Sequence, residues 1–325
     1  MDRQQAIDKI NTLAPKGIPF LFIIDFEMIE NHVWELNQIP PNIYASFSNK
    51  INIGTSPKKN HLNNFKFTKE AIRLKDYQSI YEKIISNIRY GNSYLVNLTF
   101  PTPIETSLSL LDIYIHSEAP YKLYFDNKFV VFSPESFITI RGMKIMARPM
   151  KGTIDEKIKN AEFLLLNDQK ELAEHHTVVD LLRNDLSLIA QDVTVEKFRY
   201  IERVRSRDKN LLQTSSLISG TLPEDYKNDL GDRLYALLPA GSISGAPKKE
   251  TLKIILENEN YKRGYYSGIM GVYDGENLDS AVMIRYIEQE ENNKLIFKSG
   301  GGITASSSLK NEYEEMINKV YVPIY

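Results

Sequence analysis

Apolar residues along the chain alternate irregularly between two spacings, one typical of strands and one typical of helices. Short runs rich in β-branched and aromatic residues are typical of buried strands, whereas apolar residues three and four positions apart are typical of helices. The runs predict strands at 18–26, 94–100, within 121–133, 266–273, 280–289 and 294–298, and a hairpin at 137–146 that turns at Arg141-Gly142. Helical spacing predicts helices at 76–89, ending before Gly91, at 168–185, with Asp168 as a possible cap, and at 248–257 and 308–320.

Polar and glycine-rich segments separate these elements. Residues 54–64 are mostly polar and predict an exposed loop, and 239–247 form a loop of Gly, Ser and Pro before a helix. Hairpin-like strands with helices grouped between them favour an α+β fold with a mixed or antiparallel sheet over a regular βαβ alternation.

Composition limits the class of protein. The 325 residues suffice for one large domain or two intertwined subdomains, and a net charge of -2 gives no reason to expect nucleic-acid or membrane binding. The chain has no cysteine, which excludes disulfides, thiolate metal sites and a cysteine nucleophile. Its start lacks the apolar core of a signal peptide, and the run at 18–24 is too short to span a bilayer, so we expect a cytoplasmic protein.

Two carboxylate pairs are candidates for a metal site. Glu171 and Glu174 are three apart on one predicted helix, and Glu312 and Glu315 repeat that spacing on the last helix, with Lys319 on the same face. Carboxylates from two helices could surround Mg²⁺, which prefers oxygen ligands. Spacing alone favours the alternative, in which each pair belongs to a solvated helix face.

Two glycine segments are candidates for anion binding. The segment 239–248 leads into a helix without matching the phosphate-binding P-loop pattern, and Gly300-Gly301-Gly302 follows a strand and precedes the last helix. Each could equally be an ordinary tight turn.

Two further residues could act chemically. Lys151 precedes Gly152-Thr153, and its amine could be a nucleophile if burial or nearby cations lowered its pKa. Glu135 ends a predicted strand and could protonate a leaving group if its pKa were raised. A surface lysine and a solvated glutamate are the alternatives.

Taken in order, several segments between about 85 and 320 resemble the chorismate-utilising enzymes. This family includes anthranilate synthase component I, aminodeoxychorismate synthase component I, isochorismate synthase and salicylate synthase. The segments are 91–99, Ser133-Pro134-Glu135, 148–153, 171–175, 179–185, 239–248, 263–268, 281–285, 300–302 and 312–319.

The resemblance implies a fold like that of anthranilate synthase component I: an α/β sandwich of two pseudo-repeated subdomains with mixed or antiparallel sheets. Residues 1–75 would form its N-terminal part and 76–325 the chorismate-binding catalytic region, within one compact domain. By similarity, Glu174 and Glu315 would ligate Mg²⁺ directly, and Glu171 and Glu312 would act through water. The residues that would line the substrate site are Gly152, Thr153, Tyr266, Arg285, Gly300, Gly302 and Lys319, and Glu135 resembles the general acid.

Lys151 indicates which member of the family the chain resembles most. Relatives that make anthranilate, isochorismate or salicylate usually carry alanine there, whereas aminodeoxychorismate synthases often carry lysine, which attacks C2 of chorismate as the C4 hydroxyl departs. The resemblance therefore implies a synthase that makes 4-amino-4-deoxychorismate for p-aminobenzoate and folate biosynthesis. Its ammonia would come from a separate glutamine amidotransferase subunit, because this chain has no glutaminase cysteine.

The chain departs from its relatives in three places. Gln213 stands at the place of a histidine that anthranilate synthases link to pyruvate loss, and Leu95 replaces a frequent glutamine. The short N-terminal region contains no tryptophan-binding element that we can identify. Two alternatives stay open: anthranilate synthase component I, and a non-catalytic regulatory or scaffold subunit, against which the full set of acidic and basic site residues argues.

Overall fold

Two antiparallel sheets form the framework of the protein. The computed structural model describes residues 1–324 except 56–57, 60–61, 63 and 206–209, so the predicted loop at 54–64 lies partly outside the described residues. The described residues of that loop are in no helix or strand. Every strand pair within the described chain is antiparallel, which confirms the predicted α+β class.

Each sheet contains nine strands within the described residues. The first sheet has the order β11 (Met150–Asp155), β13 (Asn210–Thr221), β10 (Lys144–Ala147), β9 (Ser136–Arg141), β16 (Leu278–Val282), β15 (Ile269–Tyr273), β1 (Phe20–Ile24) and β2 (Asn31–Glu35), with β12 (Gln191–Arg205) paired to β13. The second has the order β14 (Gly245–Ala246), β6 (Leu95–Thr106), β18 (Leu295–Ile303), β17 (Tyr286–Gln289), β8 (Phe129–Ser133), β7 (Tyr121–Phe125), β3 (Ile43–Ser46) and β4 (Asn52–Ile53), with β5 (Phe67–Lys69) paired to β6.

The sequence of strand β1 is uniformly apolar, and its position in the fold explains this. All five of its residues are buried. Phe20, Phe22 and Ile24 pack into the largest core cluster, whereas Leu21 and Ile23 belong to a second cluster together with residues of β3, β7 and β8. Because successive side chains of a strand point to opposite faces, β1 is buried on both faces. The second cluster is therefore the core between the two sheets.

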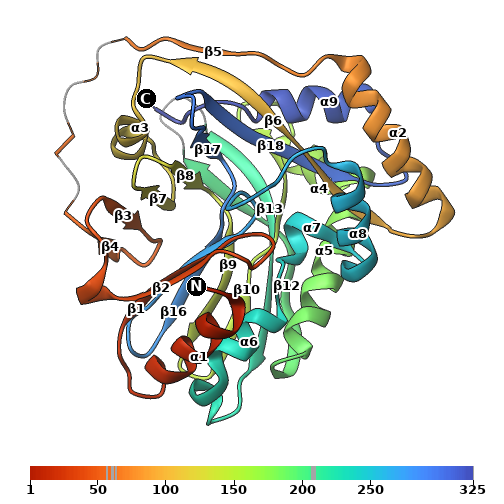
Figure 1. Ribbon diagram of the computed structural model, residues 1–325. Coiled ribbons are helices and arrows are strands. Elements are labelled where there is room, and N and C mark those ends of the chain that lie inside the picture. Colours follow the sequence, from red (N-terminus) through yellow and green to blue (C-terminus); the bar gives the residue numbers. More distant parts are fainter. Residues whose placement is uncertain (56–57, 60–61, 63, 206–209, 325) are drawn as a thin grey trace.

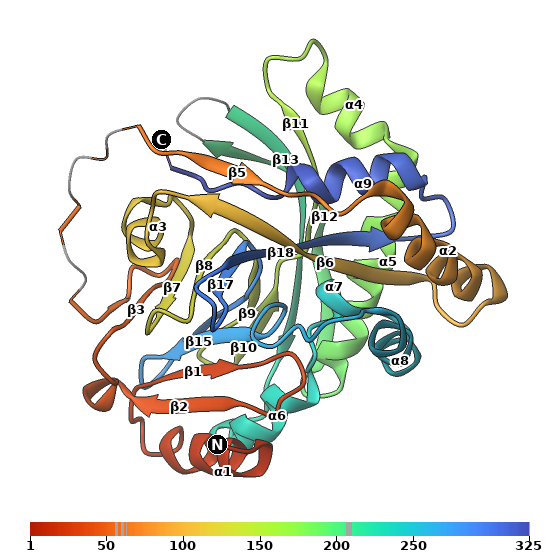
Figure 2. The same ribbon diagram turned by 45° about the horizontal axis from the view of Figure 1, so that its top comes forward.

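Helices cover the outer faces and edges of the sheets (Figures 1 and 2). They are α1 (Arg3–Leu13), α2 (Leu74–Tyr90), α3 (Leu110–His116), α4 (Ala161–Asn167), α5 (Gln169–Ser187), α6 (Leu230–Ala236), α7 (Gly241–Ser244), α8 (Lys248–Asn258) and α9 (Leu309–Asn318), with short 3-10 helices at Leu36–Gln38 and Tyr226–Asp229. Helix α5 packs against β12 and β13, α9 against β18, and α3 against β7 and β8. None of the helices in the described part of the chain is long and apolar enough to span a membrane.

Local signals confirm several predicted boundaries. Asp168 caps α5, because its side chain accepts a hydrogen bond from the Glu171 backbone N–H. Gly91 ends α2 in the left-handed conformation, with a φ of 94°. The predicted hairpin at 137–146 is the β9–β10 pair, and Gly142 in its turn has a φ of 56°.

Three predicted elements differ from the structure. The segment 121–133 is a hairpin, because Asp126 and Asn127 both adopt positive φ and turn the chain. The predicted strand at 280–289 is divided between β16 in the first sheet and β17 in the second, so this segment passes from one sheet to the other. The predicted loop at 239–247 contains the short helix α7 and strand β14.

Candidate active site

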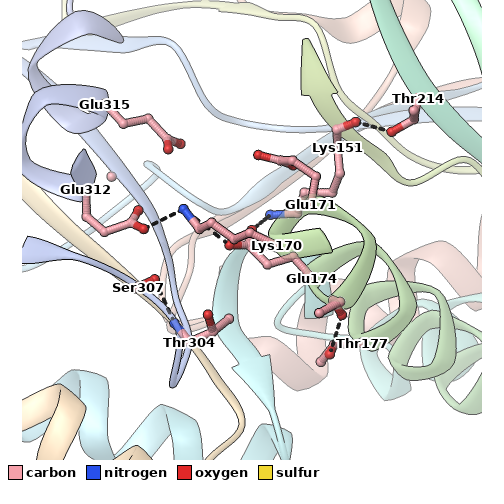
Figure 3. A network of polar contacts seen from close by, with 12 residues as sticks. Lys151, Lys170, Glu171, Glu174, Thr177, Thr214, Thr304, Ser307, Glu312 and Glu315 are labelled. Atoms are coloured by element: carbon pink, nitrogen blue, oxygen red, sulfur yellow. Dashed lines mark hydrogen bonds and ion pairs between the residues drawn. The ribbon is translucent and has the colours of Figure 1, made fainter. Parts of the chain in front are cut away.

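Helices α5 and α9 bring the four predicted metal-binding carboxylates to one place, beside the glycine segment of β18 (Figure 3). Glu171 and Glu174 lie in the first two turns of α5, and Glu312 and Glu315 lie along α9. Glu174 and Glu312 are buried. Buried carboxylates need a positive charge close by, because an unpaired buried charge is costly.

Lysines supply that charge in the structure. The Lys170 ammonium group lies 2.6 Å from Glu312 Oε1 and 3.6 Å from Glu174 Oε1. Lys151 Nζ lies 3.8 Å from Glu174 Oε2, and Lys319 Nζ lies 2.7 Å from Glu315 Oε1. Burial lowers the pKa of Lys170, but the hydrogen bond to Glu312 and the negative charges of Glu174, Glu312 and Glu315 together raise that pKa above its usual value.

The carboxylates differ in their own electrostatics. Burial raises the pKa of Glu171 and of Glu174, and the nearby Lys151 only partly offsets this effect. Burial acts in the same direction on Glu315, but the adjacent Lys319 ammonium group holds the pKa of Glu315 below its usual value. Burial lowers the pKa of Lys319, and Glu315 partly offsets this shift.

The glycines of β18 leave room for these side chains. A Cβ atom on Gly301 would lie 3.6 Å from Glu315 Oε1 and 3.6 Å from Lys319 Nζ. A Cβ atom on Gly302 would lie 3.6 Å from Lys151 Nζ and 4.0 Å from a Glu174 oxygen. The backbone of this strand therefore forms one wall of the charged cluster.

Gly300 and Gly245 allow two backbone segments to pack closely. A Cβ atom on Gly300 would lie 2.3 Å from the Leu98 carbonyl oxygen, and one on Gly245 would lie 1.9 Å from that of Leu95. At the first residue of α8, directly after the glycine segment that contains Gly245, Lys248 Nζ lies 2.8 Å from Asp185 Oδ2 and 2.9 Å from the Leu237 carbonyl oxygen. The two glycine segments hypothesised to bind anions thus also bring backbones close together.

Lys151 is held by an irregular part of the first sheet. The pairing of β11 with β13 shifts register between Lys151 and Thr153, and the intervening Gly152 has a φ of 68°. The Thr214 hydroxyl donates a hydrogen bond to the Lys151 carbonyl oxygen. A Cβ atom on Gly152 would lie 3.2 Å from Glu171 Oε2, so this bulge brings the lysine backbone to the carboxylates.

Glu135 and Arg285 are near enough to the cluster to interact electrostatically with its lysines. Burial raises the pKa of Glu135, while a hydrogen bond from Ser242 and the charges of Lys151 and Arg285 partly lower it. A carboxylic acid with a raised pKa is suited to donate a proton. Arg285 Nε is buried and has no hydrogen-bond partner among the described residues, so it is available to a bound anion.

Tyr266 and Thr153 complete the predicted set. Tyr266 is buried, and burial raises the pKa of its hydroxyl to about 12. Thr153 is exposed on β11, where it pairs with Gln213 of β13. The hydrogen bonds and ion pairs of the described residues therefore connect neither Thr153 nor the Tyr266 side chain to the charged cluster.

The side chains fit a divalent cation but do not form a ready-made cage. Within the described residues, no group of three or more His, Asp or Glu side chains is close enough to hold a metal ion, because lysines stand between the carboxylates. Glu174 Oε1 is nevertheless a buried acceptor without a hydrogen-bond partner in that part of the chain. A buried carboxylate oxygen that has, among the described residues, only the Lys170 ammonium group at 3.6 Å, beside further carboxylates, suits Mg²⁺.

The sequence prediction missed three residues of this region: Lys170, Ser242 and Thr214. Lys170 had a signal, because it lies four positions before Glu174 on the same helix face. Ser242 and Thr214 had none, because their contacts join segments that are distant in sequence.

Comparison with known proteins places the chain in a family. The sequence model of the chorismate binding enzymes matches residues 3–324. An uncharacterized PabA-like protein of Haemophilus influenzae is 47% identical over 322 residues, which cover 99% of this chain and 97% of the relative. Anthranilate synthase component 1 of Aquifex aeolicus is 38% identical over 212 residues, or 62% of this chain and 42% of the relative.

Solved structures show the same fold. MenF, the menaquinone-specific isochorismate synthase of Escherichia coli, superposes with a TM-score of 0.75 at 17% identity, over 98% of this chain and 81% of MenF. Anthranilate synthase component I of Streptococcus pneumoniae has a TM-score of 0.66 at 30% identity, over 79% of this chain and 59% of that protein. The family model matches nearly the whole chain, and the chain therefore belongs to the chorismate binding enzymes.

Proposed function

We propose that this chain is the component I subunit of an aminodeoxychorismate synthase, which converts chorismate and ammonia to 4-amino-4-deoxychorismate in p-aminobenzoate and folate biosynthesis. The observation that carries the proposal is the position of Lys151. Its amine lies between Glu174 and the glycine strand, among the residues predicted to hold the substrate and the metal. A lysine in that position is available as a nucleophile toward the bound ring.

The charges of the site match a dianionic substrate. Arg285 offers a buried nitrogen that has no hydrogen-bond partner in the part of the chain that the structure describes, and a guanidinium binds a carboxylate through two parallel hydrogen bonds. Lys319 adds a second positive charge, and the backbone of Gly301 leaves space beside it. Mg²⁺ held by Glu174 and Glu315, with Glu171 and Glu312 acting through water, would offset the substrate charge and orient the ring.

The proposed reaction uses two displacements on the ring. The unprotonated Lys151 amine forms a bond to C2, both conjugated ring double bonds shift by one position toward C4, and the C4 hydroxyl leaves as water after Glu135 has donated a proton. Ammonia then forms a bond to C4, both double bonds shift back, the C2–N bond to Lys151 breaks, and the new ammonium group returns a proton to Glu135. The two steps restore the lysine and replace one difficult displacement by two easier ones.

The ammonia requires a partner. Glutaminases that use a cysteine nucleophile cannot be built from this chain, because its sequence contains no cysteine. We therefore propose that a separate glutamine amidotransferase subunit supplies ammonia to the site.

The second candidate is anthranilate synthase component I. It is favoured by the names of relatives such as the Aquifex aeolicus protein, although that match covers 62% of this chain. Lys151 argues against it, as does Gln213, which hydrogen bonds through its amide to Glu202 at 3.3 Å rather than providing an imidazole.

Product analysis tests the proposal. The purified chain is incubated with chorismate, MgCl₂ and an ammonium salt, beside the variant Lys151→Ala. We expect the wild type to form 4-amino-4-deoxychorismate without pyruvate, and the variant to lose about two orders of magnitude or more in kcat, because the covalent step is removed.

Two results would contradict the proposal. Anthranilate and pyruvate as products would assign the chain to anthranilate synthase and make Lys151 incidental. If chorismate neither reacts nor binds in the presence of Mg²⁺ and the partner subunit, the chain is a non-catalytic member of the family.

A further inference from the structure

The stability of helix α5 alone does not explain why a lysine stands at position 170. It is the second residue of α5, where the helix dipole disfavours a positive charge. It also precedes Glu174 by four positions, and a lysine N-terminal to its glutamate partner is the weaker order for a helical ion pair. Its position therefore points to a role outside α5.

That role is a contact between the two carboxylate helices (Figure 3). Lys170 Nζ lies 2.6 Å from Glu312 Oε1 on α9 and 3.6 Å from Glu174 Oε1 on α5. Both carboxylates are buried, with exposed fractions of 3% for Glu312 and 6% for Glu174. Without a cation between them, two buried negative charges would repel each other and push the helices apart.

We propose that Lys170 is an internal counter-ion that occupies the place of Mg²⁺ in the metal-free protein and is displaced when the metal binds. The inference rests on the proposed function, because it takes Glu174 and Glu312 as members of the metal site. An ammonium group cannot share these oxygens with a divalent cation at close range, since the two positive charges repel. Lys170 thus stabilises the metal-free site and competes with the metal.

Magnesium affinity and metal-free stability test this role directly. Isothermal titration of chelator-treated full-length protein with MgCl₂ gives the affinity, and thermal unfolding in EDTA gives the stability. The variants are Lys170→Met, Lys170→Gln and Lys170→Arg. The control is Lys310→Gln, which removes an 80% exposed lysine from α9, next to Glu314 rather than the site carboxylates.

We expect Lys170→Met and Lys170→Gln to bind Mg²⁺ about tenfold more tightly than wild type, because an internal competitor has been removed. Their Tm in EDTA should fall, and saturating Mg²⁺ should restore it. Lys170→Arg keeps the charge and should bind like the wild type, as should Lys310→Gln.

Equal or weaker Mg²⁺ binding by both uncharged variants would overturn the inference, as would the absence of Mg²⁺ binding in every protein tested. If Lys170→Met folds only when Mg²⁺ is present, that result supports the counter-ion role. The product assay remains separate: formation of anthranilate would reject the proposed function while leaving the affinity result for Lys170 unchanged.

Discussion

Arg285 has several features that are typical of a ligand-binding residue. Its backbone has a φ of 55°, a left-handed conformation that is uncommon for a residue other than glycine, asparagine or aspartate. The guanidinium carbon lies 5.7 Å from the centre of the Tyr321 ring, and Nε has no hydrogen-bond partner among the described residues. An unsatisfied buried donor in a strained position indicates binding rather than stability.

We therefore expect Arg285→Ala to raise KM for chorismate roughly a hundredfold, with a smaller change in kcat, because a charge-assisted pair with a substrate carboxylate is lost. Arg285→Lys should fall between the wild type and the alanine variant, since lysine keeps the charge but not the two parallel hydrogen bonds. Steady-state kinetics measure both effects. An unchanged KM in a variant with wild-type Tm would remove Arg285 from the substrate site.

At the residue scale, the sequence motifs predicted most residues of the charged cluster. The spacing of Glu171 and Glu174 placed them on one helix face, and the structure shows that face against Gly152 and Lys151. Lys170 was missed, because the identity of its partner on α9 depends on how two distant helices pack. Their roles as ligands remain a prediction.

At the scale of elements, strand β18 joins the second sheet to the site. Gly300 pairs with Thr99 of β6. At Gly301 and Gly302, the space that a side chain would occupy borders residues of α9 and α5, respectively. The three glycines are therefore required for different reasons. Two backbones approach closely at Gly300, Gly301 leaves space for charged side chains, and at Gly302 an added Cβ atom would first meet the Leu95 side chain at 2.9 Å and then Lys151 Nζ at 3.6 Å.

The variant Gly300→Ala should lose about 3 kcal/mol or more of unfolding free energy, because its Cβ would overlap the Leu98 carbonyl, and backbone cannot move aside cheaply. The matched variant Gly301→Ala places its Cβ 3.6 Å from the Glu315 and Lys319 side chains, an ordinary contact. We expect it to keep nearly wild-type stability. Urea unfolding of the pair measures the difference, and equal losses would contradict this account of β18.

The pattern of apolar and polar residues did not lead us to predict several helices and strands. Helix α1 carried a capping box, in which Asp2 and Gln5 bond reciprocally, and its buried residues Ala6, Ile7, Ile10 and Leu13 have helical spacing. Strand β12 carried little signal, because most described side chains at 191–203 are charged or exposed and its pairing with β13 shifts register three times. Edge strands with bulges lack a clean alternation.

At the scale of the whole molecule, an aromatic contact joins the edge of the first sheet to the second. His32 of β2 stacks at 4.7 Å on Trp34 and lies 5.2 Å from the ring of Phe125 on β7. Its Nε2 hydrogen bonds with the Tyr265 hydroxyl at 2.8 Å. Burial lowers the pKa of His32 to about 4, and the positive N-terminal ammonium group adds to the shift.

This shift predicts a loss of stability in acid. The folded-state pKa lies below the unfolded value of 6.5, so the contribution of His32 is complete above pH 6.5 and is lost as the pH falls toward 4. The loss should approach about 1 kcal/mol per pH unit, with a ceiling of about 3 kcal/mol. Urea unfolding between neutral pH and pH 5 should show a shallower pH dependence for His32→Gln. Parallel curves for the two proteins would refute the assignment.

The sequence by itself determined the α+β class, the cores of helices α2, α5, α8 and α9 and of strands such as β1, β6, β15 and β18, and the family, because apolar spacing and ordered motifs are local properties of the chain. Only the tertiary structure decided that the segment 280–289 is shared between two sheets, that 121–133 forms a hairpin, and that Lys170 bridges α5 and α9. Pairing across a sheet and contact between helices depend on which distant surfaces bury each other, and that choice minimises the free energy of the whole chain rather than of any one segment.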